Sequence, residues 1–207
     1  MKLFDMKKSR TVLTVLTVLV MTLGLVACDN NDENSPVIPP AQITTDVVFG
    51  DYAGQMFTSL VEKEEGTAGT EVSAAVNNDT IAFDSIPVKD IILSVVNDEE
   101  TANQIVEAIG AVAYKIGYTP SLTEAKDSVL LALDPKPLEL VFSLPSEGEE
   151  AQQFAVKVQI SAVESGNAYE VESAGLKFHF VAEEVLLNEQ PVAEFKPMLF
   201  DFEMKQQ

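Results

Sequence analysis

The chain has 207 residues, and its 33 acidic side chains outnumber 13 basic ones, which gives a net charge of −20. This balance excludes nucleic-acid binding, because contacts to phosphate depend on Lys and Arg. One Cys and one His are present, Cys28 and His179. They are too few for a usual zinc site or for Ser-His or Cys-His catalysis, unless His179 itself takes part. We therefore expect no metal site and no cofactor.

The first 27 residues are typical of a signal peptide. Four basic side chains between Lys2 and Arg10 precede an apolar stretch that runs to Val26. The stretch is short for a membrane span, and its basic flank and small-residue end fit a cleaved leader. An uncleaved membrane helix is the alternative interpretation. Residues 1–27 are therefore left out of the reasoning about the fold.

The leader ends in Leu25-Val26-Ala27-Cys28, which resembles the lipobox of bacterial lipoproteins. The resemblance implies cleavage between Ala27 and Cys28 and acyl chains on Cys28, so that the membrane is a partner through this lipid anchor. Two or three acyl chains anchor a protein stably where one does not.

The acidic residues directly after Cys28, Asp29–Asn34, resemble the export signal of surface lipoproteins in Bacteroidetes-type bacteria. This resemblance implies an outer-membrane location with the protein exposed at the cell surface. A domain that faces the periplasm behind an ordinary solvated linker is the alternative.

Residues 28–45 are expected to form an acidic, Pro-rich linker and residues 46–207 one domain. Alternating apolar and polar side chains predict a strand over 52–60 and a hairpin of 71–76 and 80–84 around Asn77-Asn78-Asp79. The spacing then becomes helical and predicts a short helix over 88–96. Asn97 and Glu100 resemble a capping box that starts a second helix, with an apolar stripe as far as Val112.

After Pro120 the alternating pattern returns. It predicts strands over residues 128–133, 138–144, 154–161, 176–183 and 199–204, with turns at Glu147-Gly148-Glu149 and Ser165-Gly166-Asn167. Together these elements predict a mostly β domain, with an antiparallel meander of about eight strands and one or two helices in residues 87–112. The meander closes as a barrel or stacks as a sandwich.

Gly50-x-Tyr52-x-Gly54 on the first predicted strand resembles the opening of calycin-like (lipocalin-like) lipoproteins of gut Bacteroidetes. The hairpin and the mid-domain helix that follow are also similar. The resemblance implies a calycin-like β-barrel over about residues 46–205, in a family of unknown function. Lipocalins proper have Trp where this chain has Tyr52, and a late Arg that this domain lacks.

Binding, and not catalysis, is the function that these observations favour. The barrel is expected to hold a small apolar or saccharide ligand in a cavity lined by Phe142, Phe178 and Phe180. Tyr114 and Tyr118 are candidate exposed rings for a saccharide. The alternative is an acidic protein-protein interaction module that binds or inhibits a basic enzyme. No catalytic residues are predicted, because adjacent carboxylates such as Glu183 and Glu184 point to opposite faces of a strand.

Three short motifs resemble the O-glycosylation pattern of Bacteroidetes, an Asp followed by Ser or Thr and then an alkyl residue. They place candidate modified hydroxyls at Thr80, Ser85 and Ser128.

Overall fold

The structure is a computed structural model that describes residues 43–61, 68–146 and 149–207, with side chains described outside 144–151. The described elements belong to one compact unit, Ala41–Gln207. The predicted signal peptide, Cys28, most of the predicted linker and the Glu147-Gly148 turn lie outside the described residues.

The chain order of the elements follows the alternation and helical spacing of the sequence closely. A 3-10 turn η1 (Thr45–Val48) precedes strands β1 (Gly50–Leu60), β2 (Thr70–Val76) and β3 (Thr80–Phe83), and helices α1 (Lys89–Val96) and α2 (Glu99–Ile109) come next. The remaining strands are β4 (Tyr114–Leu122), β5 (Ser128–Pro135), β6 (Leu138–Ser146), β7 (Glu149–Ala162), β8 (Ala168–Glu170), β9 (Gly175–Leu187), β10 (Gln190–Pro191) and β11 (Met198–Gln206).

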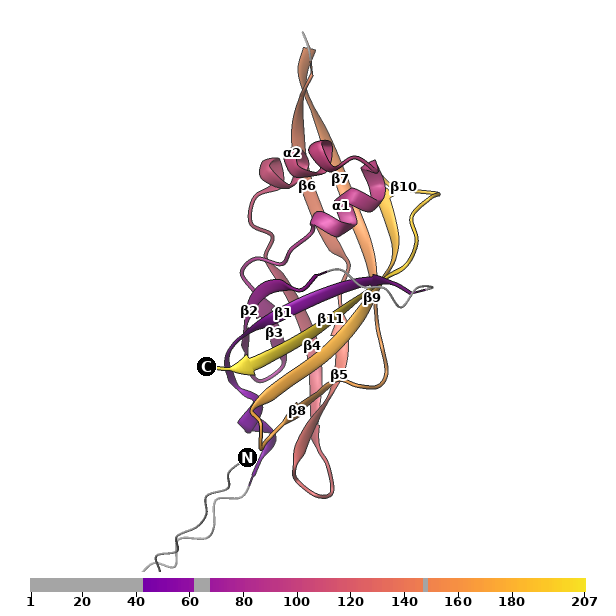
Figure 1. Cartoon of the computed structure of the whole chain (residues 1–207). Helices are drawn as coiled ribbons and strands as arrows, with labels where there is room; N and C mark the ends of the chain where they lie inside the picture. The colour runs from indigo at the N-terminus through magenta and orange to yellow at the C-terminus, as the bar shows by residue number, and fades with distance from the viewer. Residues whose placement is uncertain (1–42, 62–67, 147–148) are drawn as a thin grey trace, which may run out of the picture. The chain divides into compact units, whose positions relative to one another are not determined.

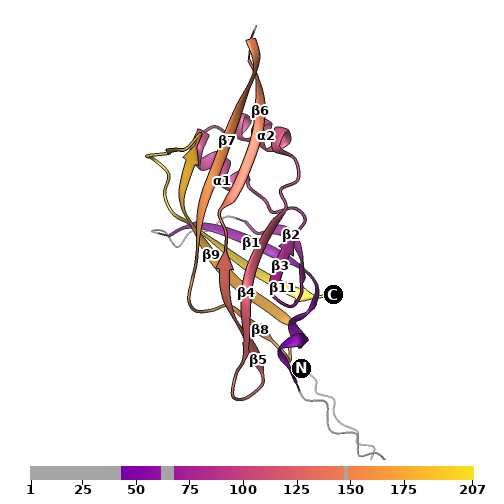
Figure 2. The same cartoon turned by 180° about the vertical axis from the view of Figure 1, so that it is seen from behind.

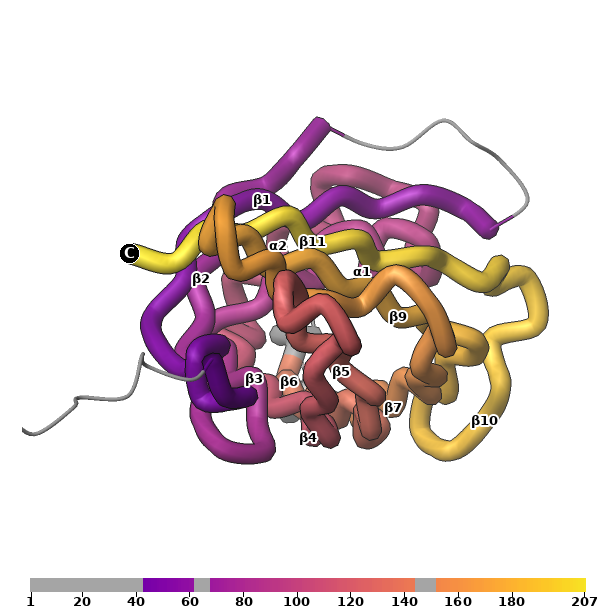
Figure 3. Tube along the Cα trace, turned by 90° about the horizontal axis from the view of Figure 1, so that it is seen from below, coloured from indigo at the N-terminus to yellow at the C-terminus, as the bar shows by residue number. Residues whose placement is uncertain are grey.

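Eight antiparallel strands close into a barrel, in the order β1-β2-β3-β4-β5-β8-β9-β11. The β11–β9 and β11–β1 pairings complete the ring, which Figure 3 shows from below. The prediction of a mostly β, calycin-like barrel with helices in residues 87–112 is confirmed. Closure removes the exposed edges that an open sheet of these strands would present.

The β6–β7 hairpin departs from a plain meander. It lies between β5 and β8 in the sequence, but β7 pairs with the second half of β9, and β6 pairs with β7 outside the ring. Figures 1 and 2 show this hairpin extending away from the barrel beside the two helices. The register of β7 on β9 shifts between Gln159 and Ile160. Glu183 and Glu184 are both exposed at this bulge, whereas a regular strand would point them to opposite faces.

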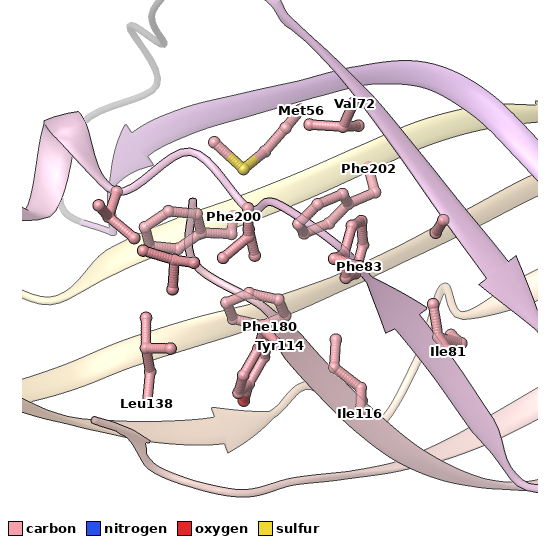
Figure 4. Close-up of a cluster of buried hydrophobic side chains, with 14 of the residues drawn as sticks. Met56, Val72, Ile81, Phe83, Tyr114, Ile116, Leu138, Phe180, Phe200 and Phe202 are labelled. Atoms are coloured by element: carbon pink, nitrogen blue, oxygen red, sulfur yellow. The ribbon is translucent and has the colours of Figure 1, made fainter. Parts of the chain in front are cut away.

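Aromatic side chains fill the barrel interior (Figure 4). Phe178 and Phe202 are cross-strand partners on β9 and β11, and their rings stack with centroids 4.5 Å apart. Phe180 and Phe200 form the next such pair, at 5.2 Å. Phe83 from β3 packs against Phe202 at 5.3 Å. Pairs of this kind add about 0.5–1.5 kcal/mol to the free energy from burial alone.

Both ends of the barrel are covered by short segments that hydrogen-bond to β1. At the start of β1, the Tyr52 hydroxyl donates to the carbonyl oxygen of Val48, at 2.7 Å, and Val48 is fully buried. Six residues further along β1, the hydroxyl of the buried Thr58 donates to the carboxylate of Asp90 on α1. The turn η1 and the helix α1 therefore sit at opposite ends of the barrel.

Further details differ from the sequence prediction. Asn97 does not cap α2: it ends α1 in the left-handed region, with φ 52°, and Asp98 is the N-cap of α2 and accepts a hydrogen bond from the backbone N–H of Thr101. Strand β4 was also not predicted, because Gly117 and Pro120 interrupt it. Its inward residues Tyr114, Ile116 and Tyr118 nevertheless alternate with period two.

Candidate ligand-binding site

An apolar cavity of about 220 Å³ lies between the helices and the β6–β7–β9 sheet, outside the barrel interior. Its wall is formed by side chains of both helices and all three strands: Ile92, Val95, Val96, Thr101, Ile105, Phe142, Phe154, Val156 and Leu187. No polar surface faces the cavity. A wall of this kind suits small apolar molecules, because it offers them packing partners and no polar group.

A backbone hydrogen bond closes the two ends of the helical segment on each other. The backbone N–H of Ile86, before α1, donates to the carbonyl oxygen of Val112, after α2, at 2.8 Å. Asp98 starts α2 directly after α1, so the two helices pack against each other, and α2 also packs against β6. On the sheet side, Phe142 and Phe154 are cross-strand partners with stacked rings 5.5 Å apart. These rings form part of the strand side of the wall, together with Val156 and Leu187.

The structure separates the three phenylalanines that the sequence placed in one cavity. Phe142 lines the cavity under the helices. Phe178 and Phe180 are 0% and 2% exposed and stack on Phe202 and Phe200 within the barrel. The prediction of a ligand cavity among Phe178 and Phe180 inside the barrel is therefore wrong, because stacked side chains occupy that space. The apolar cavity lies beside the barrel instead.

Tyr114 and Tyr118 do not offer exposed rings for a saccharide. Each is 5% exposed. The hydroxyl of Tyr114 donates to the backbone carbonyl oxygen of Lys136, at 2.6 Å. The hydroxyl of Tyr118 donates to the backbone carbonyl oxygen of Asn77. Both rings point inward from β4, so their polar tips are satisfied by the backbone and they act in packing.

Burial raises the pKa of all four tyrosines, Tyr52, Tyr114, Tyr118 and Tyr169, that of Tyr118 to about 12. The neutral phenol is thus favoured by the folded state. The stability that comes from burying the neutral phenols is complete below pH 10, the ordinary tyrosine pKa. It is lost as the pH rises through the raised pKa values of the folded state. We expect tyrosinate absorbance at 295 nm to rise together with loss of the far-ultraviolet β-sheet signal, well above pH 10. Ionisation near pH 10 with the sheet signal intact would contradict this packing.

A second, more polar groove of about 780 Å³ lies on the outer side of β1 and β2. Its described lining includes Gln55, Glu71, Ser73 and Ser85. No aromatic ring is among these lining residues, although saccharide sites depend on such rings for stacking. This groove therefore supports a saccharide ligand less well than the helix-covered cavity supports an apolar one.

The other predicted site residues are dispersed. Thr80 is half-buried at the start of β3, Ser85 is exposed before α1, and Ser128 is half-buried at the start of β5. His179 is half-buried on the outer side of β9, where its ring lies against Gly166. Within residues 43–61, 68–146 and 149–207, no group of three or more His, Cys, Asp and Glu side chains could hold a metal ion.

The fold and the cavity define a closed eight-stranded β-barrel domain that carries a pair of helices over an outlying hairpin. Residues 47–187 match the family described as a domain of unknown function (DUF4840), and the chain belongs to that family. No curated protein and no solved structure matches the chain. In the part of the chain that the structure describes, neither α1 nor α2 has the length and hydropathy of a membrane-crossing helix.

Proposed function

We propose that this protein is a non-catalytic binding module for a small apolar ligand, which it holds between the α1–α2 pair and the β6–β7 hairpin. The observation that carries the proposal is the apolar cavity wall, which includes Ile105 from α2 and Phe142 from β6. Empty apolar space costs stability, because its lining loses packing partners, and an apolar ligand restores them. Ligand sites in proteins are typically concave and mostly apolar in this way.

Filling the cavity tests the proposal. Val95 is half-buried in the cavity wall, so a Val95→Trp variant places an indole in the space that the ligand would occupy. We expect 1-octanol to bind the wild-type chain in calorimetric titration and to bind Val95→Trp at least about tenfold more weakly, a loss of about 1.4 kcal/mol.

The matched control is Gln104→Trp, which adds the same indole at an exposed position of α2. This variant should bind 1-octanol as the wild type does. Equal weakening in both variants, or absence of octanol binding to the wild type, would remove the support for this site.

We propose further that the domain is held at the outer surface of a cell envelope by acyl chains on Cys28. The lipobox-like residues Leu25–Cys28 and the acidic stretch Asp29–Asn34 support this location. Metabolic labelling with a clickable palmitate analogue should mark the wild-type protein and not a Cys28→Ser variant. Wild-type protein that stays unlabelled, with unchanged membrane partitioning in Cys28→Ser, would refute the anchor.

O-glycosylation of Thr80, Ser85 or Ser128 remains a proposal of the same kind. Ser85 has the most accessible hydroxyl of the three, because its residue is exposed in the bend before α1 while the others are half-buried. An intact mass equal to that of the unmodified lipoprotein would refute the modification.

A further inference from the structure

The strand side of the apolar cavity is elongated. Its lining runs diagonally across three adjacent strands, from Phe142 on β6 through Phe154 and Val156 on β7 to Leu187 on β9. Phe142 is the cross-strand partner of Phe154, and Val156 is that of Leu187, so the four side chains share one face of the sheet. Neighbouring strands lie about 4.8 Å apart, and this apolar floor therefore spans roughly 10 Å.

The two helices supply the opposite side of the same space. Ile92, Val95 and Val96 lie three and four residues apart on α1, and Thr101 and Ile105 lie four residues apart on α2. Residues at this spacing share one face of a helix, so each helix presents a strip of side chains to the cavity. A long floor under two strips suits an extended chain better than a globular molecule.

The two ends of the floor differ in exposure. At the β6 end Phe142 is 7% exposed, and α2 packs against β6 with its cavity residue Ile105 only 4% exposed. At the β9 end Leu187 is half-buried. The β6 end is therefore the closed end of the cavity.

The volume of the cavity sets how much of a chain it accommodates. An apolar cavity of about 150 Å³ in another protein binds benzene, so 220 Å³ has room for roughly eight or nine carbon atoms. The wall offers no polar surface, and burying a polar group without a hydrogen-bond partner is costly. The polar end of an amphiphile therefore stays outside, and its alkyl chain fills the cavity.

We infer that the site binds free amphiphiles with one unbranched alkyl chain of about eight carbons, and that Ile105 at the closed end sets this length limit. The inference rests on the proposed function, because it names the class of ligand for the same cavity. Bilayer lipids do not fit this description: one leaflet is about 15 Å thick, so their chains exceed the roughly 10 Å floor. Recognition then depends on chain length, with little contribution from the head group.

A series of 1-alkanols from 1-pentanol to 1-undecanol tests this inference on the chain from residue 29 onward, which retains the compact unit Ala41–Gln207. In calorimetric titration, each added methylene should tighten binding about fourfold as far as about 1-octanol, because it buries another apolar group. Beyond that length each methylene stays outside the cavity, and we expect a gain of less than about 1.5-fold. The same chain should not co-sediment with vesicles of dioleoylphosphatidylcholine.

Variants of Ile105 locate the closed end. Ile105→Ala opens space there and should extend the fourfold rise by about two methylenes, to about 1-decanol. Ile105→Val is a smaller change that disturbs packing less, and should extend the rise by about one methylene even if the alanine variant does not fold. The control is Val141→Ala, an equally apolar truncation on β6 at a side chain that is 59% exposed and points to the other face of the sheet. It should leave the length limit unchanged.

Failure of the inference is distinguishable from failure of the proposed function. Absence of binding for every alkanol would refute the cavity as a ligand site and the inference with it. Affinity that is independent of chain length, or that rises fourfold per methylene through 1-undecanol, would overturn the inference and leave the apolar site standing. A length limit that is unmoved in both Ile105 variants, or moved equally in Val141→Ala, would overturn the role of Ile105. Co-sedimentation with the vesicles would overturn the restriction to free single-chain amphiphiles.

Discussion

A Phe202→Ala variant should lose about 3–5 kcal/mol of the free energy of unfolding, which is a large part of the total for a domain of this size. Phe202 is fully buried and its ring contacts three others: Phe178 at 4.5 Å, Phe83 at 5.3 Å and Phe180 at 5.4 Å. Its removal leaves a cavity in the middle of the barrel, because the rings around it come from strands that the closed ring holds in place.

Urea unfolding followed by far-ultraviolet circular dichroism measures this loss. The matched control is Leu130→Ala, since Leu130 is an apolar residue of β5 that is 47% exposed. We expect the control to change the free energy of unfolding by less than about 0.5 kcal/mol. A Phe202→Ala variant as stable as Leu130→Ala would mean that the barrel interior is not packed as described.

A Gly54→Ala variant should also be strongly destabilised, by about 3 kcal/mol or more, because β1 and β11 approach each other closely at this position. A Cβ atom on Gly54 would lie 2.1 Å from the carbonyl oxygen of Glu203 and 2.5 Å from Cα of Met204. Both neighbours are backbone atoms, so the two strands must separate to admit a methyl group. The β1–β11 pairing is one of the pairings that close the barrel.

The control for this variant is Gly117→Ala on β4, another barrel strand. The Cβ atom there would lie 3.3 Å from the carbonyl oxygen of Asp134, which a shift of a few tenths of an ångström relieves. Thermal unfolding should show a much lower midpoint for Gly54→Ala than for Gly117→Ala. Equal midpoints would contradict the close approach of β1 and β11.

Much of the fold can be read from the sequence, because most strands are half-buried and show period two. Phe178 and Phe180, like Phe200 and Phe202, occupy alternate positions and do form the core. Strand β4 escaped prediction because its glycine and proline outweigh an alternation that is otherwise regular. The two-residue β10 and three-residue β8 are too short to carry a periodic signal.

The candidate site is harder to predict, because no local pattern marks it. Phe142 and Phe154 look like ordinary inward residues of a hairpin, and Ile105 like part of a helical stripe. They meet because β7 pairs with the second half of β9 and carries β6 out of the ring, under α2. Sequence reasoning named Phe142 but placed it with Phe178 and Phe180, since a barrel interior is the usual cavity of a calycin-like fold.

Xenon binding is the most direct test of where this protein holds an apolar ligand. Crystals of the domain under xenon pressure should show the atom between Ile105 on α2 and Phe142 on β6, as expected for an apolar cavity of about 220 Å³. Xenon among Phe178, Phe180 and Phe202 would place the hollow inside the barrel, and a cavity without xenon would mean that side chains already fill it. Either result would contradict the account.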